Sequence, residues 1–234
     1  MDLKLDHPRA TDFVHPYVFF ANHNRSSEVT LVSPSVRDVL GYDPEQIPGL
    51  SYNRFVEKGN RLNEDIPACE TEDLSDGHSI RALRSVLDSS GNQRILLVHT
   101  VGVAEHEGGP VVRRHNIARD VTESVMTHRS LMSRLKDLET ASGCLSDQEK
   151  QIAECIMKGM MNRDIARDLK ISDRTVERRR ASILKHMDAA NTSELVAKMV
   201  ERNMLRTWTY AASDLHWQSA RNSHLAVEQA TVAI

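Results

Sequence analysis

The stretch SDRTVERRRASILKHM, residues 172–187, sets three arginines in a row between apolar residues at helical spacing. Ser172 has the side chain of a helix N-cap, so a helix is expected to begin there. Four apolar residues of this helix would share its buried face: Val176, Ile183, Leu184 and Met187. The arginines then fan over the exposed half of the helix and its two edges. The pattern therefore predicts a helix with one buried stripe and a cationic outer surface.

Three further helices are predicted around this one, between residues 145 and 205. Ser146, Asn162 and Asn191 are their expected N-caps, and a glutamate follows Ser146 and Asn191 at the third position, as in a capping box. The last helix is expected to bury four residues: Leu195, Val196, Met199 and Val200. A tight connection separates the helix after Asn162 from the helix after Ser172. These two helices have the proportions of a helix-turn-helix.

The charge distribution agrees with a local basic surface. Residues 163–185 hold eight Lys or Arg and four Asp or Glu, a net charge of +4, whereas the whole chain carries −3. An alternative is a solvated helix face whose cations pair with acids one turn away. Charge alone does not separate the two interpretations. The helix-turn-helix proportions favour an outer face that enters a DNA groove, where long cations reach phosphates on both walls.

The composition of the chain sets wider limits. A length of 234 residues suits two domains, and an odd number of cysteines, three, favours free thiols in a reducing compartment over a disulfide framework. The N-terminus lacks the apolar segment of a signal peptide, and no stretch approaches the roughly 20 apolar residues that span a bilayer. We therefore expect a soluble, cytoplasmic protein without a membrane partner. No nucleophile–base pairing, metal cluster or phosphate loop indicates an enzyme.

The sequence pattern of the first half of the chain predicts strands separated by turns. Strands are expected at residues 79–87, 95–103 and 111–118, and the DSSGN sequence of residues 88–92 predicts a hairpin turn. After Asp120 helical periodicity takes over, with Asp120 and Glu123 spaced as a capping box. The apolar residues of this helix resemble a short coiled-coil seam: Val121, Val125, Met132 and Leu135. A single amphipathic helix lying on its own domain is the alternative.

The sequence LSDQEKQIAECIMKGMMNRDIARDLKISDRTVERRRASILKHMDAANTSELV resembles the LuxR-type (GerE or FixJ-type) DNA-binding domain over about 60 residues. The resemblance implies that Glu177, Arg178 and Ala181 face bases. It also implies a larger set of DNA-binding residues that includes phosphate contacts: Ser172, Arg174, Thr175, Glu177, Arg178, Arg179, Arg180, Ala181 and Lys185. Two positions depart from the family, Arg179 where His is frequent and Asp188 where Gly is frequent, and the second predicts a less well capped helix end. For Glu177, an intrahelical ion pair is the alternative to base contact.

The N-terminal half resembles a PAS domain, through VTLVSPSVRDVLGYDPEQIPG, the hairpin SVLDSSGNQRILLVHTVGV and the closing VVRRHNIARDVTE. The implied fold class is an α+β PAS domain with a five-stranded antiparallel sheet and helices, then a helical linker and an all-α, four-helix helix-turn-helix domain. The expected boundaries are residues 1–16 for an N-terminal extension, 17–120 for the PAS domain, 121–143 for the linker, 144–205 for the DNA-binding domain and 206–234 for a tail.

The sequence does not identify the ligand of the PAS-like half. His99 falls among alternating apolar residues, so it is a candidate ligand-binding residue for haem or another small molecule. The alternative is a core histidine satisfied by one hydrogen bond. Cys69 lies in PACETED rather than in the motif of the flavin-binding photosensory members, which disfavours a flavin photocycle. The histidines form no cluster with metal-ligand spacing.

Together these features predict a homodimeric transcriptional regulator that binds double-stranded DNA in a sequence-specific manner. Its PAS domain would sense a small ligand or mediate dimerisation, and RNA polymerase is a further partner that such a regulator implies. The alternative is a protein-interaction module in which DNA binding is secondary. It predicts weak, salt-insensitive DNA binding, whereas a DNA-binding regulator predicts an affinity that falls with salt.

Overall fold

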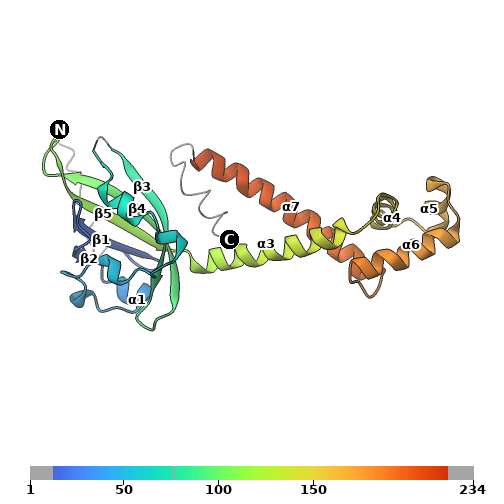
Figure 1. The fold of residues 1–234 in the computed structure, drawn as a ribbon, viewed down its shortest axis with the longest axis horizontal. Helices are drawn as coiled ribbons and strands as arrows, with labels where there is room; N and C mark the ends of the chain where they lie inside the picture. The colour runs from blue at the N-terminus through green and yellow to red at the C-terminus, as the bar shows by residue number, and fades with distance from the viewer. Residues whose placement is uncertain (1–12, 76, 221–234) are drawn as a thin grey trace. The chain divides into compact units, whose positions relative to one another are not determined.

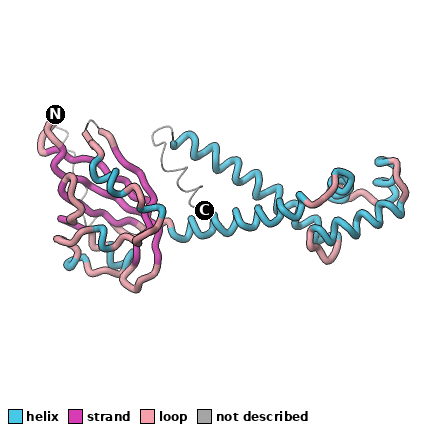
Figure 2. The backbone as a smooth tube through the Cα atoms, viewed as in Figure 1, coloured by secondary structure: helices cyan, strands magenta, loops and turns pink. Residues whose placement is uncertain are grey.

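The computed structural model describes residues 13–75 and 77–220, with the backbone alone for residues 210–220. The chain divides into two compact units, and the boundary between them falls after residue 126. Figures 1 and 2 show that strands occur in the first unit and that the second is built from helices. Each unit is described by itself below.

The first unit contains a five-stranded antiparallel sheet with the strand order β2-β1-β5-β4-β3 (Figure 1). Its strands are β1 (Tyr17–His23), β2 (Val29–Val32), β3 (Ser79–Leu87), β4 (Gln93–Ala104) and β5 (Val111–Asp120). The three strands expected from the sequence are confirmed, with β4 and β5 each longer than expected. The first strand pairs with the last, so residues far apart in the chain meet at the centre of the sheet.

Short helical segments connect β2 to β3. They are α1 (Val36–Leu40), η2 (Pro44–Gln46), η3 (Tyr52–Arg54), η4 (Arg61–Asn63) and α2 (Ile66–Thr71). Apolar residues of α1 pack with those of the sheet into one core that includes Val18, Leu96 and Ala118. An antiparallel five-stranded sheet accompanied by short helices is the fold class that the resemblance to PAS domains implies.

The expected hairpin turn joins β3 to β4. Asp88 Oδ1 accepts hydrogen bonds from the backbone N–H groups of Ser90 (3.0 Å) and Asn92 (2.8 Å). Gly91 takes a left-handed conformation, with φ of +82°. A carboxylate that accepts from the backbone two residues on, followed by a glycine at positive φ, is the turn chemistry that the DSSGN sequence predicts.

The second unit is helical (Figure 2). Its helices are α3 (Thr122–Gly143), which begins before the boundary, α4 (Asp147–Met157), α5 (Asn162–Leu169), α6 (Asp173–His186) and α7 (Thr192–Ala220). Buried residues of α4 to α7 form one core, with Ile152, Ile165, Val176 and Ile183 each at 0% exposure. The four helices expected between residues 145 and 205 are therefore present.

Three expectations about the helix ends and faces need correction. First, Asp120 Oδ1 accepts from the Thr122 N–H (2.9 Å), as an N-cap side chain does, but the Asp120 N–H donates to the Pro16 carbonyl (2.9 Å), so Glu123 does not complete a capping box. Second, α7 continues beyond residue 205 to Ala220, since no glycine or proline interrupts it. Third, Val200 is 45% exposed rather than buried, because only Leu195 and Met199 of its helix face the core fully.

The linker helix contacts α7 through polar side chains. Arg134 of α3 donates two hydrogen bonds to the carboxylate of Glu201, at 2.9 and 2.8 Å. Arg206 and Glu139 form a second ion pair at 3.6 Å. Leu135 and Leu138 of α3 are both buried. The second half of α3 is therefore held within the helical unit.

Candidate nucleic-acid interface and candidate ligand cavity

The connection between α5 and α6 is short because both helix ends are closed by local hydrogen bonds. Lys170 follows α5 in the left-handed conformation, with φ of +54°. The Ile171 N–H then donates to the Ala166 carbonyl at 3.0 Å. At the start of α6, the Ser172 hydroxyl accepts from the Thr175 N–H at 3.2 Å, as the sequence predicts. Two consecutive caps thus fix the angle between the helices.

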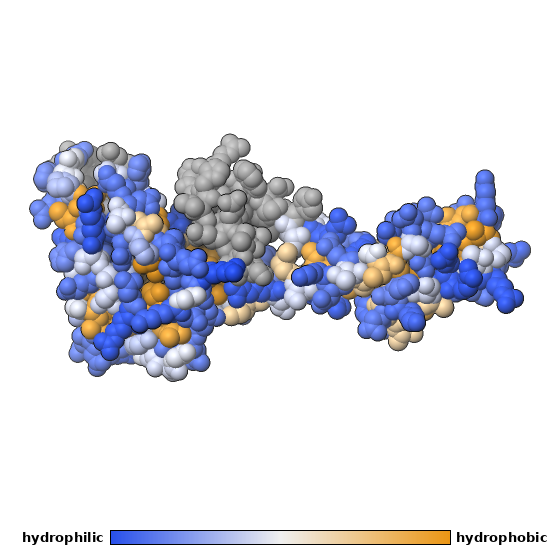
Figure 3. Space-filling model, viewed as in Figure 1, coloured by the Kyte–Doolittle hydropathy of each residue, from blue (hydrophilic) through white to orange (hydrophobic). Residues whose placement is uncertain are grey.

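One face of α6 is buried and the opposite face is exposed to solvent. Val176 and Ile183 have no exposed area and Met187 is buried, so the core side is the one expected from the sequence. Six of the expected DNA-binding residues are exposed: Ser172, Arg174, Glu177, Arg178, Ala181 and Lys185. Figure 3 shows mainly hydrophilic side chains on the visible surface of α4 to α6.

The exposed cations of α6 make no ion pair within the described residues. This holds for Arg174, Arg178 and Lys185, and Glu177 likewise has no ion-pair partner there. On α5, by contrast, Arg167 pairs with Asp164 at 2.9 Å. The pairing that would make α6 an ordinary solvated face is therefore seen on α5 and not on α6. The long cations of α6 stay available for phosphates.

Arg180 joins three helices. Its Nη1 atom donates to Asn162 Oδ1 of α5 at 2.6 Å, and its Nη2 atom donates to Thr192 Oγ1 of α7 at 2.9 Å. Asn162 is therefore the first residue of α5 rather than its cap, since its side-chain oxygen is engaged by Arg180 and Met161 precedes the helix. The role of Arg180 as an internal link was not visible in the sequence.

Arg179 and Glu149 connect α6 to α4. The Glu149 side chain completes the expected capping box by accepting from the Ser146 N–H (2.9 Å), and Arg179 lies 3.7 Å from the same carboxylate. Glu149 is only 4% exposed. Hydrogen bonds from Ser146 and Ser182, together with the positive charge of Arg179, lower the pKa of Glu149 to about 2. One buried carboxylate thus caps α4 and holds α6 against it.

The core of the first unit contains a partly open cavity of about 140 Å³. Apolar residues of the sheet, α1 and the following loops form most of its wall: Val18, Phe20, Val29, Val32, Val36, Leu40, Tyr42, Ile47, Phe55, Val56, Ile66, Ile80, Ala82, Val86, Leu96, Val98 and Ala118. A mostly apolar pocket with a few polar groups in its wall is typical of small-molecule binding sites.

Strand register gathers polar side chains at one part of the cavity wall. Asn22 of β1 pairs with Arg114 of β5, and the next inward-facing residue of β5, Asn116, pairs with Thr100 of β4. Asn116 donates to Asn22 Oδ1 (2.8 Å) and accepts from the Thr100 hydroxyl (2.7 Å). All four residues line the cavity. The sheet therefore presents a polar group of side chains beside an otherwise apolar space.

Residues of η3 and α2 complete the polar part of the wall. The Tyr52 hydroxyl donates to Glu70 Oε1 at 2.7 Å, and the Asn53 side chain donates to the same oxygen at 3.2 Å. Burial and the hydrogen bond to Glu70 raise the pKa of Tyr52 well above its ordinary value, so this hydroxyl stays protonated. Tyr52 and Glu70 both line the cavity.

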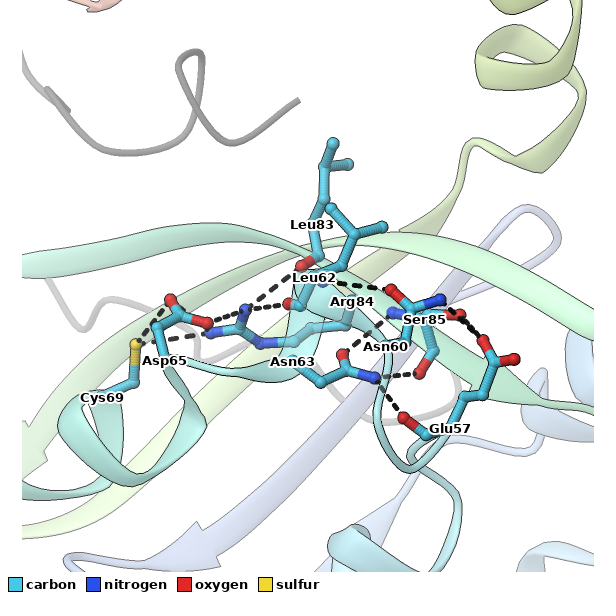
Figure 4. A network of polar contacts seen from close by, with 9 residues as sticks. All are labelled: Glu57, Asn60, Leu62, Asn63, Asp65, Cys69, Leu83, Arg84 and Ser85. Atoms are coloured by element: carbon cyan, nitrogen blue, oxygen red, sulfur yellow. Dashed lines mark hydrogen bonds and ion pairs between the residues drawn. The ribbon is translucent and has the colours of Figure 1, made fainter. Parts of the chain in front are cut away.

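Figure 4 shows how the segment that carries α2 is fastened to β3. Arg84 of β3 pairs with Asp65 at 2.7 Å and donates to the Leu62 carbonyl at 2.7 Å. Asn63 donates to the carbonyls of Glu57 (2.9 Å) and Ser85 (2.8 Å). The positive charge of Arg84 is therefore paired with a carboxylate, and the hydrogen bonds of Arg84 and Asn63 hold this segment against β3.

His99 does not line this cavity. Its neighbours Val98 and Thr100 do, so His99 points to the opposite face of the sheet. Leu97 and Val101, which share its face, are each 37% exposed. The prediction that His99 faces the core was wrong because residues 95–98 of β4 are all apolar. Alternation of apolar and polar residues therefore does not identify the inner face of this strand. No histidine lies among the residues that line the cavity, so an axial histidine for haem is not present in its wall.

Within residues 13–75 and 77–220, no group of three or more His, Cys, Asp or Glu side chains is arranged to hold a metal ion. In the same ranges, no helix combines the length and apolar composition that crossing a membrane requires. The α5–α6 surface and the cavity are therefore the two candidate sites that the geometry supports.

Comparison with known families decides the nature of the helical unit. The model of the family "Bacterial regulatory proteins, luxR family" (GerE) matches residues 143–199, which include α4, α5, α6 and the start of α7. Residues 143–199 form a luxR-family domain. The matched family is one of regulatory proteins and not of enzymes.

Individual relatives agree with the luxR-family assignment of this domain. The regulatory protein FixJ of Azorhizobium caulinodans is 50% identical over 52 residues, which are 22% of this chain and 25% of FixJ. The response regulatory protein TtrR of Salmonella typhimurium is 39% identical over 54 residues, 23% of this chain and 26% of TtrR. The chain thus spans between a quarter and a third of the length of the curated relatives that it matches.

Among solved structures, VqmA bound to DPO is similar over 78% of this chain and 81% of VqmA, with 15% sequence identity and a TM-score of 0.32. Similarity at this identity and TM-score does not carry a function from one protein to another.

Proposed function

We propose that this protein is a DNA-binding transcriptional regulator whose helix α6 enters the major groove. The observation that carries the proposal is the exposed face of α6 in a luxR-family domain, with Arg174, Arg178 and Lys185 unpaired within the described residues. A helix presented beyond a short turn by a packed neighbour is the geometry with which helix-turn-helix proteins read base edges. Positive charge on that face supplies the sequence-independent attraction to phosphates.

The burial pattern supports a division of roles along α6. Glu177, Arg178 and Ala181 lie on the exposed face and are proposed to contact bases. Arg174 and Lys185, near the two ends of the helix, are proposed to contact phosphates, together with Ser172 and Thr175 at its N-terminus. Arg179 and Arg180 are proposed to act mainly by holding α6 in position, since their guanidinium groups already contact Glu149, Asn162 and Thr192.

The PAS-like unit is proposed to sense a small ligand, and the protein is proposed to act as a homodimer. The cavity of about 140 Å³ supports the first proposal. For the second, α7 carries exposed apolar side chains at four-residue steps, Val200, Met204 and Trp208. A second copy of α7 would cover this stripe. Pairing of two reading helices favours half-sites about 10 base pairs apart, or a multiple of that spacing.

The proposal is tested by DNA binding of the full chain at several salt concentrations. Sequences are first enriched from a random duplex pool, and the affinity for the enriched duplex is then measured by fluorescence anisotropy. We expect the logarithm of the affinity to fall with the logarithm of the salt concentration, by about 0.9 for each phosphate neutralised. A weak affinity that does not change with salt would instead favour the protein-interaction module.

Two substitutions separate base contacts from phosphate contacts. Arg178→Ala should weaken binding to the enriched sequence by about 1–3 kcal/mol and relax the sequence preference. Lys185→Ala should weaken binding to all duplexes alike and lower the salt slope by about one phosphate. Lys136→Ala is the matched control, because Lys136 is an exposed cation of α3 and its loss changes the net charge equally. If Arg178→Ala and Lys185→Ala both behaved like Lys136→Ala, the proposed interface would be wrong.

A further inference from the structure

Arg114 places a positive charge in the wall of the cavity. The residue lines the cavity and is only 4% exposed. Its neighbour Arg113 points to the other face of β5 and is exposed. An arginine guanidinium keeps its positive charge in a protein interior. The inner face of the sheet therefore carries a permanent, desolvated cation.

The partners of Arg114 are neutral oxygens. Its Nε donates to Asn24 Oδ1 (3.0 Å), Nη1 to the Cys69 carbonyl (2.6 Å) and Nη2 to the Glu72 carbonyl (2.6 Å). The two carbonyls lie at the end of α2, so Arg114 ties this helix to the sheet. No carboxylate of the described residues forms an ion pair with it.

These three hydrogen bonds do not use all the N–H donors of the Arg114 guanidinium group. The group has five N–H donors, and the bonds above engage one donor on each nitrogen. One N–H on Nη1 and one on Nη2 therefore have no partner among the described residues. A buried charge without a counter-charge is costly, and a guanidinium N–H donates a short, strong hydrogen bond to a carboxylate oxygen.

The other two charged side chains of the wall have partners of different kinds, an ion pair for Arg84 and hydrogen bonds from neutral groups for Glu70. Arg84 is paired with Asp65 at 2.7 Å. Glu70 accepts hydrogen bonds from Tyr52 and Asn53 at its Oε1 atom. Among the described cavity-lining cations, Arg114 is thus the one that lacks a carboxylate partner. The remaining wall is mostly apolar, and a cavity of about 140 Å³ holds a molecule of roughly six to ten non-hydrogen atoms.

We propose that the cavity binds a small monocarboxylate with a compact apolar body, whose carboxylate pairs with Arg114. The apolar body fills the space between Val36, Leu96 and Ala118. The proposal deepens the ligand-sensing part of the proposed function and rests on it. The ligand carboxylate supplies the counter-charge that the described part of the chain does not give to Arg114, and the apolar body of the ligand contacts the apolar wall of the cavity.

The first test compares acids with neutral molecules of the same shape. Benzoate and benzamide are titrated into the full chain by calorimetry, and cyclohexanecarboxylate and its amide form a second pair. We expect each acid to bind at least tenfold more tightly than its amide. Amides that bind as tightly as the acids, or acids that produce no binding heat and no shift of the melting temperature, would overturn the proposal.

The second test removes the proposed counter-charge. Arg114→Gln should lower the affinity for benzoate at least tenfold, whereas its matched control Arg113→Gln should leave it unchanged. Because Arg114 also ties α2 to the sheet, circular dichroism checks the fold of each variant. If Arg114→Gln fails to fold, Arg114→Lys keeps the charge but loses the planar guanidinium donors, and it should bind benzoate more weakly than the wild type. Unchanged affinity in whichever variant folds would refute the assignment.

The two proposals fail in different ways. Benzoate binding is measured without DNA, so a protein that binds benzoate but shows no salt-dependent DNA affinity would refute the proposed regulator and keep the carboxylate site. A protein that binds DNA as expected but prefers amides over acids would keep the regulator and refute the carboxylate site. Benzoate that binds without changing DNA affinity would remove the sensing role alone.

Discussion

Replacing Glu149 by glutamine tests how α6 is held in the luxR-family domain. The carboxylate is buried, it accepts from the Ser146 N–H and hydroxyl, and Arg179 lies 3.7 Å away. Glutamine keeps the shape and one acceptor oxygen but removes the negative charge. Arg179 then loses its counter-charge, and the hydroxyls of Ser146 and Ser182 lose a charged acceptor.

The size of the effect follows from the pKa of Glu149. A folded-state pKa of about 2 lies some 2.5 units below the ordinary value of 4.5. At about 1.4 kcal/mol per unit, the ionised carboxylate contributes up to about 3 kcal/mol to folding at neutral pH. Because glutamine retains one hydrogen bond, we expect Glu149→Gln to lower the free energy of unfolding by about 2 kcal/mol.

The pH dependence has a definite sign. A carboxyl whose pKa is lower in the folded state stabilises the fold above its unfolded pKa and loses that contribution as protons bind. The difference between wild type and Glu149→Gln should therefore be full above about pH 5 and should shrink as the pH falls towards 2. Other carboxylates with lowered pKa values, such as Glu194 and Glu201, are present in both proteins and cancel in the difference.

The assay is urea unfolding followed by circular dichroism at the helical signal. The helical unit dominates this signal because α1 and α2 of the first unit have only five and six residues. Glu154→Gln, an exposed change on the same helix, is the matched control and should alter stability by less than about 0.5 kcal/mol. A difference of that size for Glu149→Gln as well, or one that grows as the pH falls, would refute this account.

Three further predictions concern single residues; the first two are checked by the same unfolding assay, and the third, which lies in β4 of the first unit, is checked by hydrogen exchange of the β4 and β5 amides. Arg180→Ala should lower the free energy of unfolding by about 2 kcal/mol because two charged hydrogen bonds are lost. Arg180→Lys should be almost as destabilising, since one ammonium group does not span both Asn162 and Thr192. Asp188→Gly should stabilise the domain by about 0.5–1 kcal/mol because this residue has φ of +48°; a loss of stability would contradict that. Gly102→Ala should destabilise the first unit by about 1–3 kcal/mol, because a Cβ atom would lie 2.5 Å from the Leu74 carbonyl oxygen.

Local signals in the sequence predicted most of the helical unit. Ser146 and Ser172 are helix caps whose partners lie three residues away, so both residues of each interaction can be recognised in the sequence. The buried and exposed faces of α6 follow from helical periodicity in the same way. The interaction of Arg180 with Asn162 and Thr192 was missed because its partners lie 18 and 12 residues away, and no periodic pattern links them.

The ligand site was less accessible to sequence reasoning. His99 was a wrong choice because β4 has apolar residues at both parities, so that only the three-dimensional structure identifies the inner face. Arg114 lies in VVRRHNIARD, where two adjacent arginines look alike, although one is buried and one is exposed. Its pairing with Asn22 depends on the register of strands that are about 90 residues apart. Neither fact has a local sequence signal.

Arg180 and Arg179 tie α6 to α4, α5 and α7, so α6 cannot tilt on its own without breaking the bonds to Asn162 and Thr192 and straining the contact to Glu149. We therefore expect these four helices to move together as one body. If the domain binds DNA as proposed, a signal from the first unit would act by moving, pairing or covering the whole domain. Substitutions that alter such control are then expected in α3 and α7, which lie at its two ends, rather than among the residues that hold α6 in place.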